Sequence, residues 1–154
     1  MQNSWKTEAC LLRVKNILES YQRLLGEALI ADVGDLGEQG EALFHAPFVV
    51  VAHGTESDPV LNFGNETALR LWEMDWDAFT RTPSRFTAEV PNREERARLL
   101  AEVTEHGFIR NYSGVRISRT GRRFRIEQAT VWNVYGPKGE RCGQAATFSD
   151  WVPL

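Results

Sequence analysis

A short apolar stretch that turns directly into a helix, at residues 59–79, constrains the fold of this chain more than any other feature. Residues 60–63 are predicted to form a strand. Asn65 follows as a helix N-cap, because its side chain can accept a hydrogen bond from an unpaired amide of the first helical turn. A helix is expected at residues 66–74 and a short second turn at 76–79. This segment predicts a mixed fold with an aromatic-rich core.

Composition limits the kind of protein. The chain has 154 residues, which suffices for one domain with a sizeable core. Its formal net charge of −3 argues against a general nucleic-acid binder, since such proteins carry a basic surplus. Five tryptophans are a heavy aromatic load for one domain, and aromatic side chains fill cores and also line pockets and interfaces.

The cysteines and the apolar runs indicate a cytoplasmic protein. Cys10 and Cys142 lie far apart and form no paired motif, so they predict neither a metal site nor a redox site. We expect two free thiols, as is usual in a reducing compartment. No apolar run approaches the roughly 18 residues of a membrane span, and the N-terminus lacks the pattern of a signal peptide. No membrane partner is therefore expected.

The N-terminal segment, residues 9–30, is predicted to be an amphipathic helix. Its apolar residues recur at seven-residue spacing and form a broad stripe that some other surface must cover. Two alternatives stay open: the helix packs on its own domain, or it forms a homodimer. The predicted dimer interface comprises Leu11, Val14, Leu18, Tyr21 and Leu25.

Residues 32–41 contain three glycines and four acidic residues, and are predicted to be a linker without helix or strand. The chain is accordingly divided into residues 1–41, helix and acidic glycine-rich linker, and residues 42–154, the main domain.

The remaining pattern predicts an α+β domain. Apolar β-branched residues at 47–53 form a hairpin with the strand at 60–63, and a helix capped by Asn92 is expected at 93–106. Three strands joined by tight turns follow, at 108–118, 122–134 and 141–151. Consecutive strands joined this way are antiparallel. The prediction is a five-stranded antiparallel sheet with helices packed on one face, preceded by the N-terminal helix.

This order of elements is that of PAS domains, and the chain resembles the bacterial stand-alone MEKHLA-domain proteins, a PAS-like family. The blocks that carry the resemblance are LLRVKNILESYQRLLGEALI, APFVVVAHGTESDPVLNFGNETALRLWEMDWDAF, PSRFTAEVPNREERARLLAEV, YSGVRISRTGRRFRIEQATVWNV and GQAATFSDW. The resemblance implies a PAS-like fold and a role in sensing or protein interaction. It implies no defined enzymatic activity and no particular cofactor.

Polar residues inside the apolar rows of the last two strands suggest a pocket. Buried amides are costly unless they are hydrogen-bonded, so these groups either bond one another or face a cavity in which a ligand bonds them. Largely aromatic walls with a few convergent polar groups are typical of a small-molecule site. The residues predicted to bind a ligand are His53, Phe63, Trp72, Gln128, Thr130, Trp132, Gln144 and Phe148.

A run of arginines around the hairpin at residues 116–125 is the most charged stretch of the chain. Alternation along the strand places Arg123 and Arg125 on the solvent face, where Glu127 can pair with Arg125. We therefore expect a solvated sheet face. An acidic protein partner is the main alternative, and nucleic acid is not expected.

Three functions remain. The first is a non-enzymatic sensory domain that binds a small ligand or a protein partner. The second is a pure interaction or dimerisation module without a ligand. The third is a small enzyme in which His53 acts as acid or base beside Asp58, although His53 reads more simply as a strand-end residue that bonds the next turn. No nucleophile, phosphate-loop or metal-ligand motif is present, so no catalytic residue and no metal ligand is assigned.

Overall fold

The computed structural model of the chain describes residues 4–154. Its elements, in chain order, are η1 (Ser4–Lys6), α1 (Glu8–Leu25), α2 (Leu36–Phe44), β1 (Val49–His53), β2 (Leu61–Gly64), α3 (Glu66–Trp72), α4 (Trp76–Phe79), η2 (Ser84–Thr87), α5 (Val90–His106), β3 (Phe108–Ile117), β4 (Arg123–Tyr135), β5 (Arg141–Phe148) and β6 (Asp150–Pro153). No helix among these is long and apolar enough to span a membrane.

One antiparallel sheet organises the domain. Its strand order is β2-β1-β5-β4-β3, and β6 pairs with the first half of β4. The α+β prediction with an antiparallel sheet is confirmed. The predicted last strand, 141–151, is divided at Ser149, so that β5 pairs with residues 130–135 of β4 and β6 with residues 124–127.

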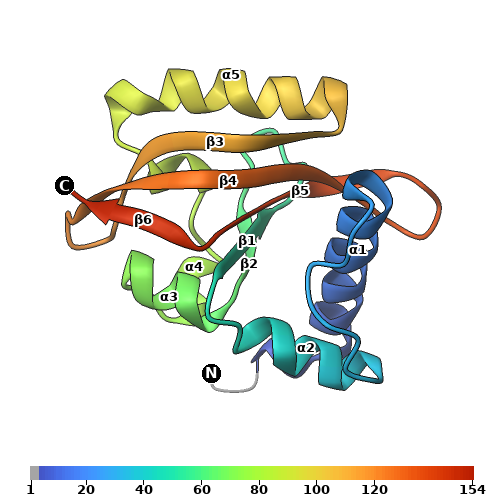
Figure 1. Ribbon diagram of the computed structural model, residues 1–154. Helices are drawn as coiled ribbons and strands as arrows, with labels where there is room; N and C mark the ends of the chain where they lie inside the picture. The colour runs from blue at the N-terminus through green and yellow to red at the C-terminus, as the bar shows by residue number, and fades with distance from the viewer. Residues whose placement is uncertain (1–3) are drawn as a thin grey trace.

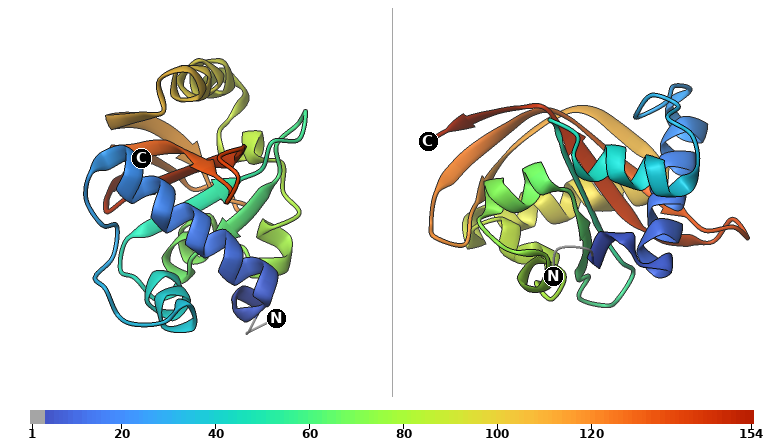
Figure 2. Two further views of the ribbon diagram at one scale, coloured as in Figure 1. Left: turned by 90° about the vertical axis from the view of Figure 1, so that its right-hand side faces the viewer. Right: turned by 90° about the horizontal axis from the view of Figure 1, so that it is seen from below.

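Helices cover both faces of this sheet. Figure 2 shows the sheet curved around α3, α4 and α5, the face on which helices were predicted. Helix α1 packs on the other face, against β4. Figure 1 shows α1 and α2 next to each other, with α5 across the sheet from them. The side chains that α1 buries pack with Trp132 and Val134 of β4, whereas Leu99 and Val103 of α5 pack with Val131. Alternate residues of β4 therefore belong to two different layers.

Two β-bulges set which side chain faces which layer. Between the pairs Ile109–Val131 and Gly114–Ile126, β3 and β4 each gain one extra residue. The extra residues have positive φ angles, 59° at Asn111 and 53° at Gln128. An extra residue reverses the alternation beyond it. The predicted single face running from Phe124 to Val134 is therefore wrong, because the two ends of that row lie on opposite sides of the sheet.

Helix α1 packs against its own domain. Thr7 caps its first turn, and Gly26, with φ of 76°, ends it, which is earlier than the predicted residue 30. Val14 is fully buried, and Tyr21 meets the Trp132 ring edge-on at 4.9 Å.

The predicted dimer seam is thus covered largely within the chain. Leu11 packs against Gly40 of α2, where an added Cβ atom would lie 2.6 Å from a Leu11 methyl carbon. Leu18 and Leu25 are half-buried against the same core. Within the single chain, the helix packs on its own domain; the homodimer stays a prediction.

The predicted linker contains a helix, α2, and in this respect the prediction is wrong. Asp35 Oδ1 accepts from the Glu38 amide at 2.9 Å, and Glu38 Oε1 accepts from the Asp35 amide at 3.0 Å. This capping box and the burial of Leu43 and Phe44 outweigh the low helix propensity of the glycines. The predicted boundary between residues 41 and 42 falls inside this helix.

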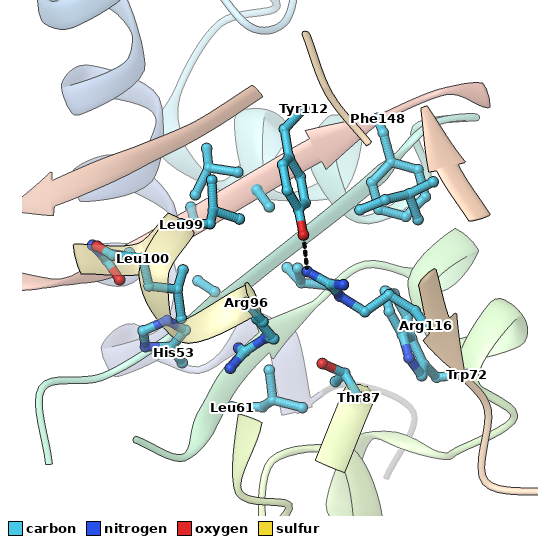
Figure 3. Close-up of a pocket in the computed structure, with 17 residues that line it drawn as sticks. His53, Leu61, Trp72, Thr87, Arg96, Leu99, Leu100, Tyr112, Arg116 and Phe148 are labelled. Carbon is cyan, nitrogen blue, oxygen red and sulfur yellow. Dashed lines mark hydrogen bonds between the residues drawn. The ribbon is translucent and has the colours of Figure 1, made fainter. Parts of the chain in front are cut away.

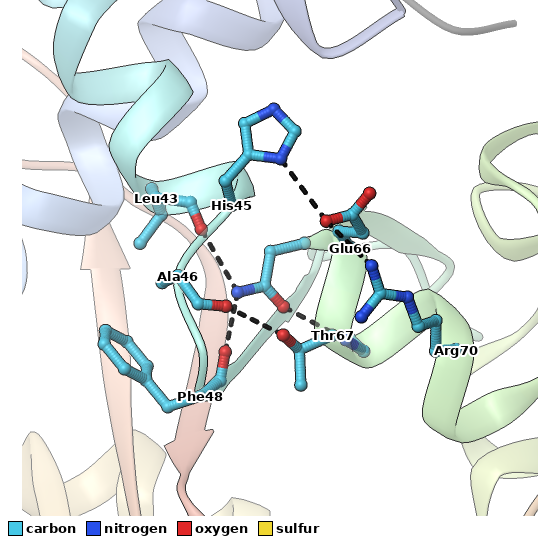
Figure 4. Close-up of polar contacts among 9 residues, drawn as sticks. Leu43, His45, Ala46, Phe48, Glu66, Thr67 and Arg70 are labelled. Carbon is cyan, nitrogen blue, oxygen red and sulfur yellow. Dashed lines mark hydrogen bonds and ion pairs between the residues drawn. The ribbon is translucent and has the colours of Figure 1, made fainter.

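Asn65 joins three elements at the start of α3. As predicted, it caps the helix: Oδ1 accepts from the Ala68 amide at 3.2 Å, and it also accepts from Val50 at 3.1 Å. Its Nδ2 donates to the carbonyl groups of Leu43, at 3.1 Å, and Phe48, at 2.8 Å, which Figure 4 shows converging on one side chain. Because all four bonds are buried or half-buried, this side chain fixes α2 and α3 against β1.

Helix α5 begins earlier than predicted, at Val90, with Glu89 in the N-cap position in place of Asn92. Pro91 fits the first turn, because its missing amide proton has no partner there in any case.

Candidate functional site

A cavity lies between the inner face of the sheet and helices α3 and α5 (Figure 3). Its volume is about 60 Å³, enough for a few water molecules or a small organic group. The walls are mainly apolar, and the polar side chains among them come from five elements. The lining residues are Val51, Ala52, His53, Leu61, Trp72, Thr87, Arg96, Leu99, Leu100, Tyr112, Arg116, Ile126, Val131, Gln144, Ala145, Ala146 and Phe148.

His53, the last residue of β1, is buried at one end of the cavity. Its Nδ1 lies 2.9 Å from the Gly54 carbonyl oxygen, the turn contact that the sequence suggested. Burial is the main cause that lowers its pKa to about 4, so the ring is neutral near pH 7. Since a carbonyl only accepts, the proton is on Nδ1 and Nε2 is a bare acceptor. Nε2 has no hydrogen-bond partner within the described chain.

The predicted pairing of His53 with Asp58 does not form. Asp58 makes an ion pair with Arg85 in an exposed position. Among the described residues, no carboxylate accepts a hydrogen bond from the His53 ring, because Nδ1 is bonded to the Gly54 carbonyl.

Trp72 forms another wall of the cavity at the end of α3. It is 3% exposed and meets Phe124 edge-on at 5.3 Å and Phe148 at 6.2 Å between ring centroids. Its indole nitrogen is buried, and no residue from 4 to 154 accepts its hydrogen. A buried N–H without an acceptor destabilises the protein by about 1–3 kcal/mol, so this donor is an unusual feature.

Two arginines line the middle of the cavity. Arg116 of β3 is 5% exposed; its guanidinium donates to the Tyr112 hydroxyl at 3.0 Å and to the Val115 carbonyl at 2.9 Å. Arg96 of α5 reaches in from the other side, as Figure 3 shows. Burial, and next the positive charge of Arg116, lower the pKa of Arg96 to about 10, so Arg96 remains a cation near pH 7.

The sequence prediction missed both arginines. Arg96 precedes Leu99, Leu100 and Val103 by three, four and seven residues, so it shares their face of α5. That spacing was available in the sequence. Arg116 belongs to the arginine run that was expected to be solvated.

The rest of that run is as predicted. Arg125 pairs with Glu127 at 2.9 Å, and Arg123 pairs with Glu89 at the same distance. These side chains are partly exposed, which agrees with a solvated sheet face.

Gln144 lies at the edge of the cavity but is bonded by its own chain. Its Nε2 lies 3.0 Å from the Leu100 carbonyl, 2.9 Å from the Thr104 hydroxyl and 3.1 Å from Asn133 Oδ1. Asn133, its cross-strand partner, in turn donates to the Val103 carbonyl at 3.0 Å. These amides tie the end of α5 to the sheet, so their burial does not call for a ligand.

Four of the eight predicted ligand residues lie outside the cavity. Trp132 is fully buried on the opposite face, where its indole N–H donates to the Ile17 carbonyl at 3.3 Å. Thr130 is on that face too, Phe63 packs edge-on against Trp76, and Gln128 is exposed. The bulge at Gln128 causes most of this error, because it turns Thr130 and Trp132 away from the cavity and Val131 towards it. His53, Trp72, Gln144 and Phe148 do line it.

The cysteines lie elsewhere. Cys10 is buried in α1 and Cys142 is half-buried in β5, both as free thiols. Neither lines the cavity between the sheet and α5. Within residues 4–154, no cluster of three His, Cys, Asp or Glu side chains is positioned to hold a metal ion.

This curved antiparallel sheet with helices on its inner face defines a PAS-like fold. It superposes on a PAS domain from Colwellia psychrerythraea with a TM-score of 0.63, at 14% identity, over 77% of this chain and 96% of that one. An RNA-binding light-oxygen-voltage receptor gives 0.63 at 15% identity, over 78% of this chain and 36% of that chain. Identities this low establish the fold alone.

The sequence identifies the family. The MEKHLA domain matches residues 12–153, and the chain therefore belongs to the MEKHLA-domain family. Relatives include the homeobox-leucine zipper proteins HOX9 of Oryza sativa subsp. indica, 26% identical over 88% of this chain, and ATHB-14 of Arabidopsis thaliana, 26% identical over 92%.

The match covers 16% and 17% of those two relatives, so this chain corresponds to a small part of each. Both are plant proteins, and the expectation of a bacterial stand-alone member is not supported.

Proposed function

We propose that this chain is a non-enzymatic sensory domain that binds a small ligand in the cavity between the sheet and helices α3 and α5. The family and the PAS-like fold support a sensory role. Binding would alter the contacts of the domain with a partner protein, or with a second copy of the chain through a surface other than the buried seam of α1. We place this activity in the cytoplasm, on the sequence grounds given above.

Two residues in the wall of the cavity, Trp72 and His53, each bury a polar atom that has no partner within the described chain, and this observation carries the proposal. A domain whose only role is to present its outer surface has no need for a cavity with such residues in its wall. A ligand that bonds these atoms would remove the cost of burying them. The enzyme alternative is weaker, because the described residues offer no activated nucleophile at the site and no carboxylate bonded to His53.

Native mass spectrometry tests the proposal directly. The protein is purified from its own host and weighed under native and then denaturing conditions. We expect a small molecule to be released on denaturation. A single apo mass in both conditions, with no thermal shift across a metabolite panel, would contradict ligand binding and favour the pure interaction module.

A matched pair of variants locates the ligand. Ala146 lines the cavity, so Ala146→Leu fills it, and we expect this variant to purify without the small molecule. Ala97→Leu makes the same change at an exposed position on α5 and should keep it. Retention of the molecule by Ala146→Leu would place the ligand elsewhere.

A further inference from the structure

The two arginines of the cavity form no ion pair with a carboxylate of the described residues. Seventeen residues line the cavity, and none of them is aspartate or glutamate. Buried charged groups are usually paired, because removal of an ion from water is costly unless an opposite charge replaces the water. This cavity therefore presents positive charge that the lining residues do not neutralise.

Arg116 reaches an acidic group only indirectly. Its guanidinium bonds the Tyr112 hydroxyl at 3.0 Å, and that hydroxyl donates to Glu95 Oε1 at 2.9 Å. The tyrosine thus stands between the two charges. Two neutral acceptors, the Tyr112 hydroxyl and the Val115 carbonyl, leave most of the five guanidinium hydrogens of Arg116 free for another acceptor.

Arg96 is half-buried and has fewer hydrogen-bond partners than Arg116. Within residues 4–154 it makes no hydrogen bond to a side chain and no ion pair. Its neighbours Arg93 and Arg98 on the same helix do have partners, the Ala88 carbonyl and Glu94. The charge of Arg116 also acts on Arg96 and favours its deprotonation. Two cations that repel each other inside one cavity create a site for an anion.

The indole N–H of Trp72, a residue in the cavity wall, also favours an acceptor such as an anion. The Trp72 indole N–H can only donate, and it is buried without an acceptor. Figure 3 shows Trp72 beside Arg116, away from His53 at the other end. Trp72, Phe148 and Leu99 supply apolar surface around these donors. The small volume excludes a large ligand unless the side chains move.

We propose that the cavity recognises a small organic carboxylate with a short apolar body, held by Arg96, Arg116 and the Trp72 indole N–H. This inference rests on the proposed sensory function and names the ligand class. A planar carboxylate matches the fork of donors that a guanidinium presents, and charge-assisted bonds of this kind are strong. The apolar body would lie against Trp72 and Phe148. The bare Nε2 of His53 would accept from a donor on that body or from a trapped water molecule.

Matched probes separate charge from shape. Thermal unfolding and calorimetric titration are run with butyrate and benzoate, with their neutral amides butyramide and benzamide, and with inorganic phosphate. We expect the carboxylates to stabilise the protein and the amides to have little effect. Equal effects of acids and amides, or no effect of either carboxylate at millimolar concentration, would overturn the carboxylate inference. Binding of phosphate alone would also overturn it.

Arginine variants test the assigned residues. Arg96→Gln should weaken carboxylate binding about tenfold to a hundredfold, while the unliganded protein keeps its stability or gains some, because an unpaired cation is removed. Arg98→Gln, on the same helix with an exposed side chain, should leave binding and stability unchanged. Unaltered carboxylate binding by Arg96→Gln, or a loss of unliganded stability that Arg98→Gln does not show, would assign Arg96 a structural role instead.

The two proposals can fail separately. Release of a neutral molecule in native mass spectrometry, with its loss in Ala146→Leu, would keep the sensory function and reject the anion. An apo protein that responds to no compound would reject both.

Discussion

Each face of the sheet buries a tryptophan. The described chain supplies a hydrogen-bond acceptor for the indole N–H of one tryptophan and not for that of the other. Under α1, the Trp132 N–H donates to the Ile17 carbonyl at 3.3 Å, and the Tyr135 amide donates to Ser20 Oγ at 2.8 Å. Under α3 and α5, the Trp72 N–H has no acceptor within the described chain.

The two faces differ in packing as well. Helix α1 contributes fully buried Val14 and Ile17 to the core, beside a mixed polar and apolar hollow lined by Arg13 and Asn62. Helix α5 buries only Leu99 and Val103 and borders a mainly apolar cavity. Helix α5 also directs Arg96 into that cavity.

At its buried tryptophan the α1 face is completed by the chain, whereas the α5 face leaves the Trp72 N–H and His53 Nε2 unbonded, which is the pattern of a binding site. The α1 face has one unbonded buried atom as well, Asn62 Oδ1.

The largest expected difference between the two faces concerns core truncation. Ile17→Ala removes a fully buried side chain and should lower the free energy of unfolding by about 2–5 kcal/mol. Leu100→Ala, at a half-buried residue that already borders the cavity, should cost about 1–2 kcal/mol. Urea unfolding of both variants measures this, and equal losses would show that the cavity face is packed as tightly as the other.

A pH experiment examines the cavity face next. His53 has its pKa lowered from 6.5 to about 4, chiefly by burial, so the unfolded chain binds a proton in this range and the folded one does not. Stability contributed by this residue is complete above pH 6.5 and is lost as pH falls towards 4. The expected loss is on the order of 2–3 kcal/mol.

The measurement compares wild type with His53→Gln by urea unfolding at neutral pH and near pH 4, since the difference cancels other titrating groups. His45→Gln, at an exposed residue, is the control. A wild-type slope that survives in His53→Gln would assign the pH dependence to other residues.

Substitution of the two tryptophans, one on each face, should have a smaller effect on the free energy of unfolding and tests the faces more specifically. Trp132→Phe loses a satisfied hydrogen bond and buried volume, so we expect a loss of about 1–3 kcal/mol in unfolding free energy. Trp72→Phe loses similar volume but also removes an unbonded N–H, so its net cost should be below about 1 kcal/mol. Chemical denaturation measures both, and a larger loss for Trp72→Phe would mean that its N–H is bonded in solution.

The smallest expected loss of unfolding free energy concerns α2, the helix that packs beside α1. Asp35→Ala removes the N-cap of α2 and should cost about 1 kcal/mol. Because α2 contacts α1 and lies away from the cavity, carboxylate binding should not change. A change in binding would show that the two faces are coupled.

The order of elements was predictable because local chemistry specifies it. Asn65 after an apolar strand marks the start of α3, and the turns between the last strands fix their antiparallel order. Helix α2 was also readable in principle, from the capping-box residues Asp35 and Glu38, but its glycines argued for a linker.

The site was predicted only in part, because the side of the sheet to which a side chain points depends on the register of the strands. One extra residue at Gln128 moved Trp132 out of the predicted cavity, and no local sequence signal marks that bulge clearly. The arginines were missed for a different reason. Arg96 stands on the apolar face of α5, but a charged side chain there is normally expected to extend to solvent.

The sequence by itself determined most of the elements, the antiparallel order of the last strands and the family, because hydrophobic period, caps and turn residues act over a few neighbours. The strand-to-helix joint at 59–79 and the burial of Trp72 follow from that local pattern. Only the tertiary structure decided what Trp72 faces. Its neighbours Phe124, Phe148 and Arg116 come from three strands, and the two bulges between β3 and β4 set the direction of Phe124 and Arg116. A cavity is the space that distant segments leave between them, so no short stretch of sequence specifies it.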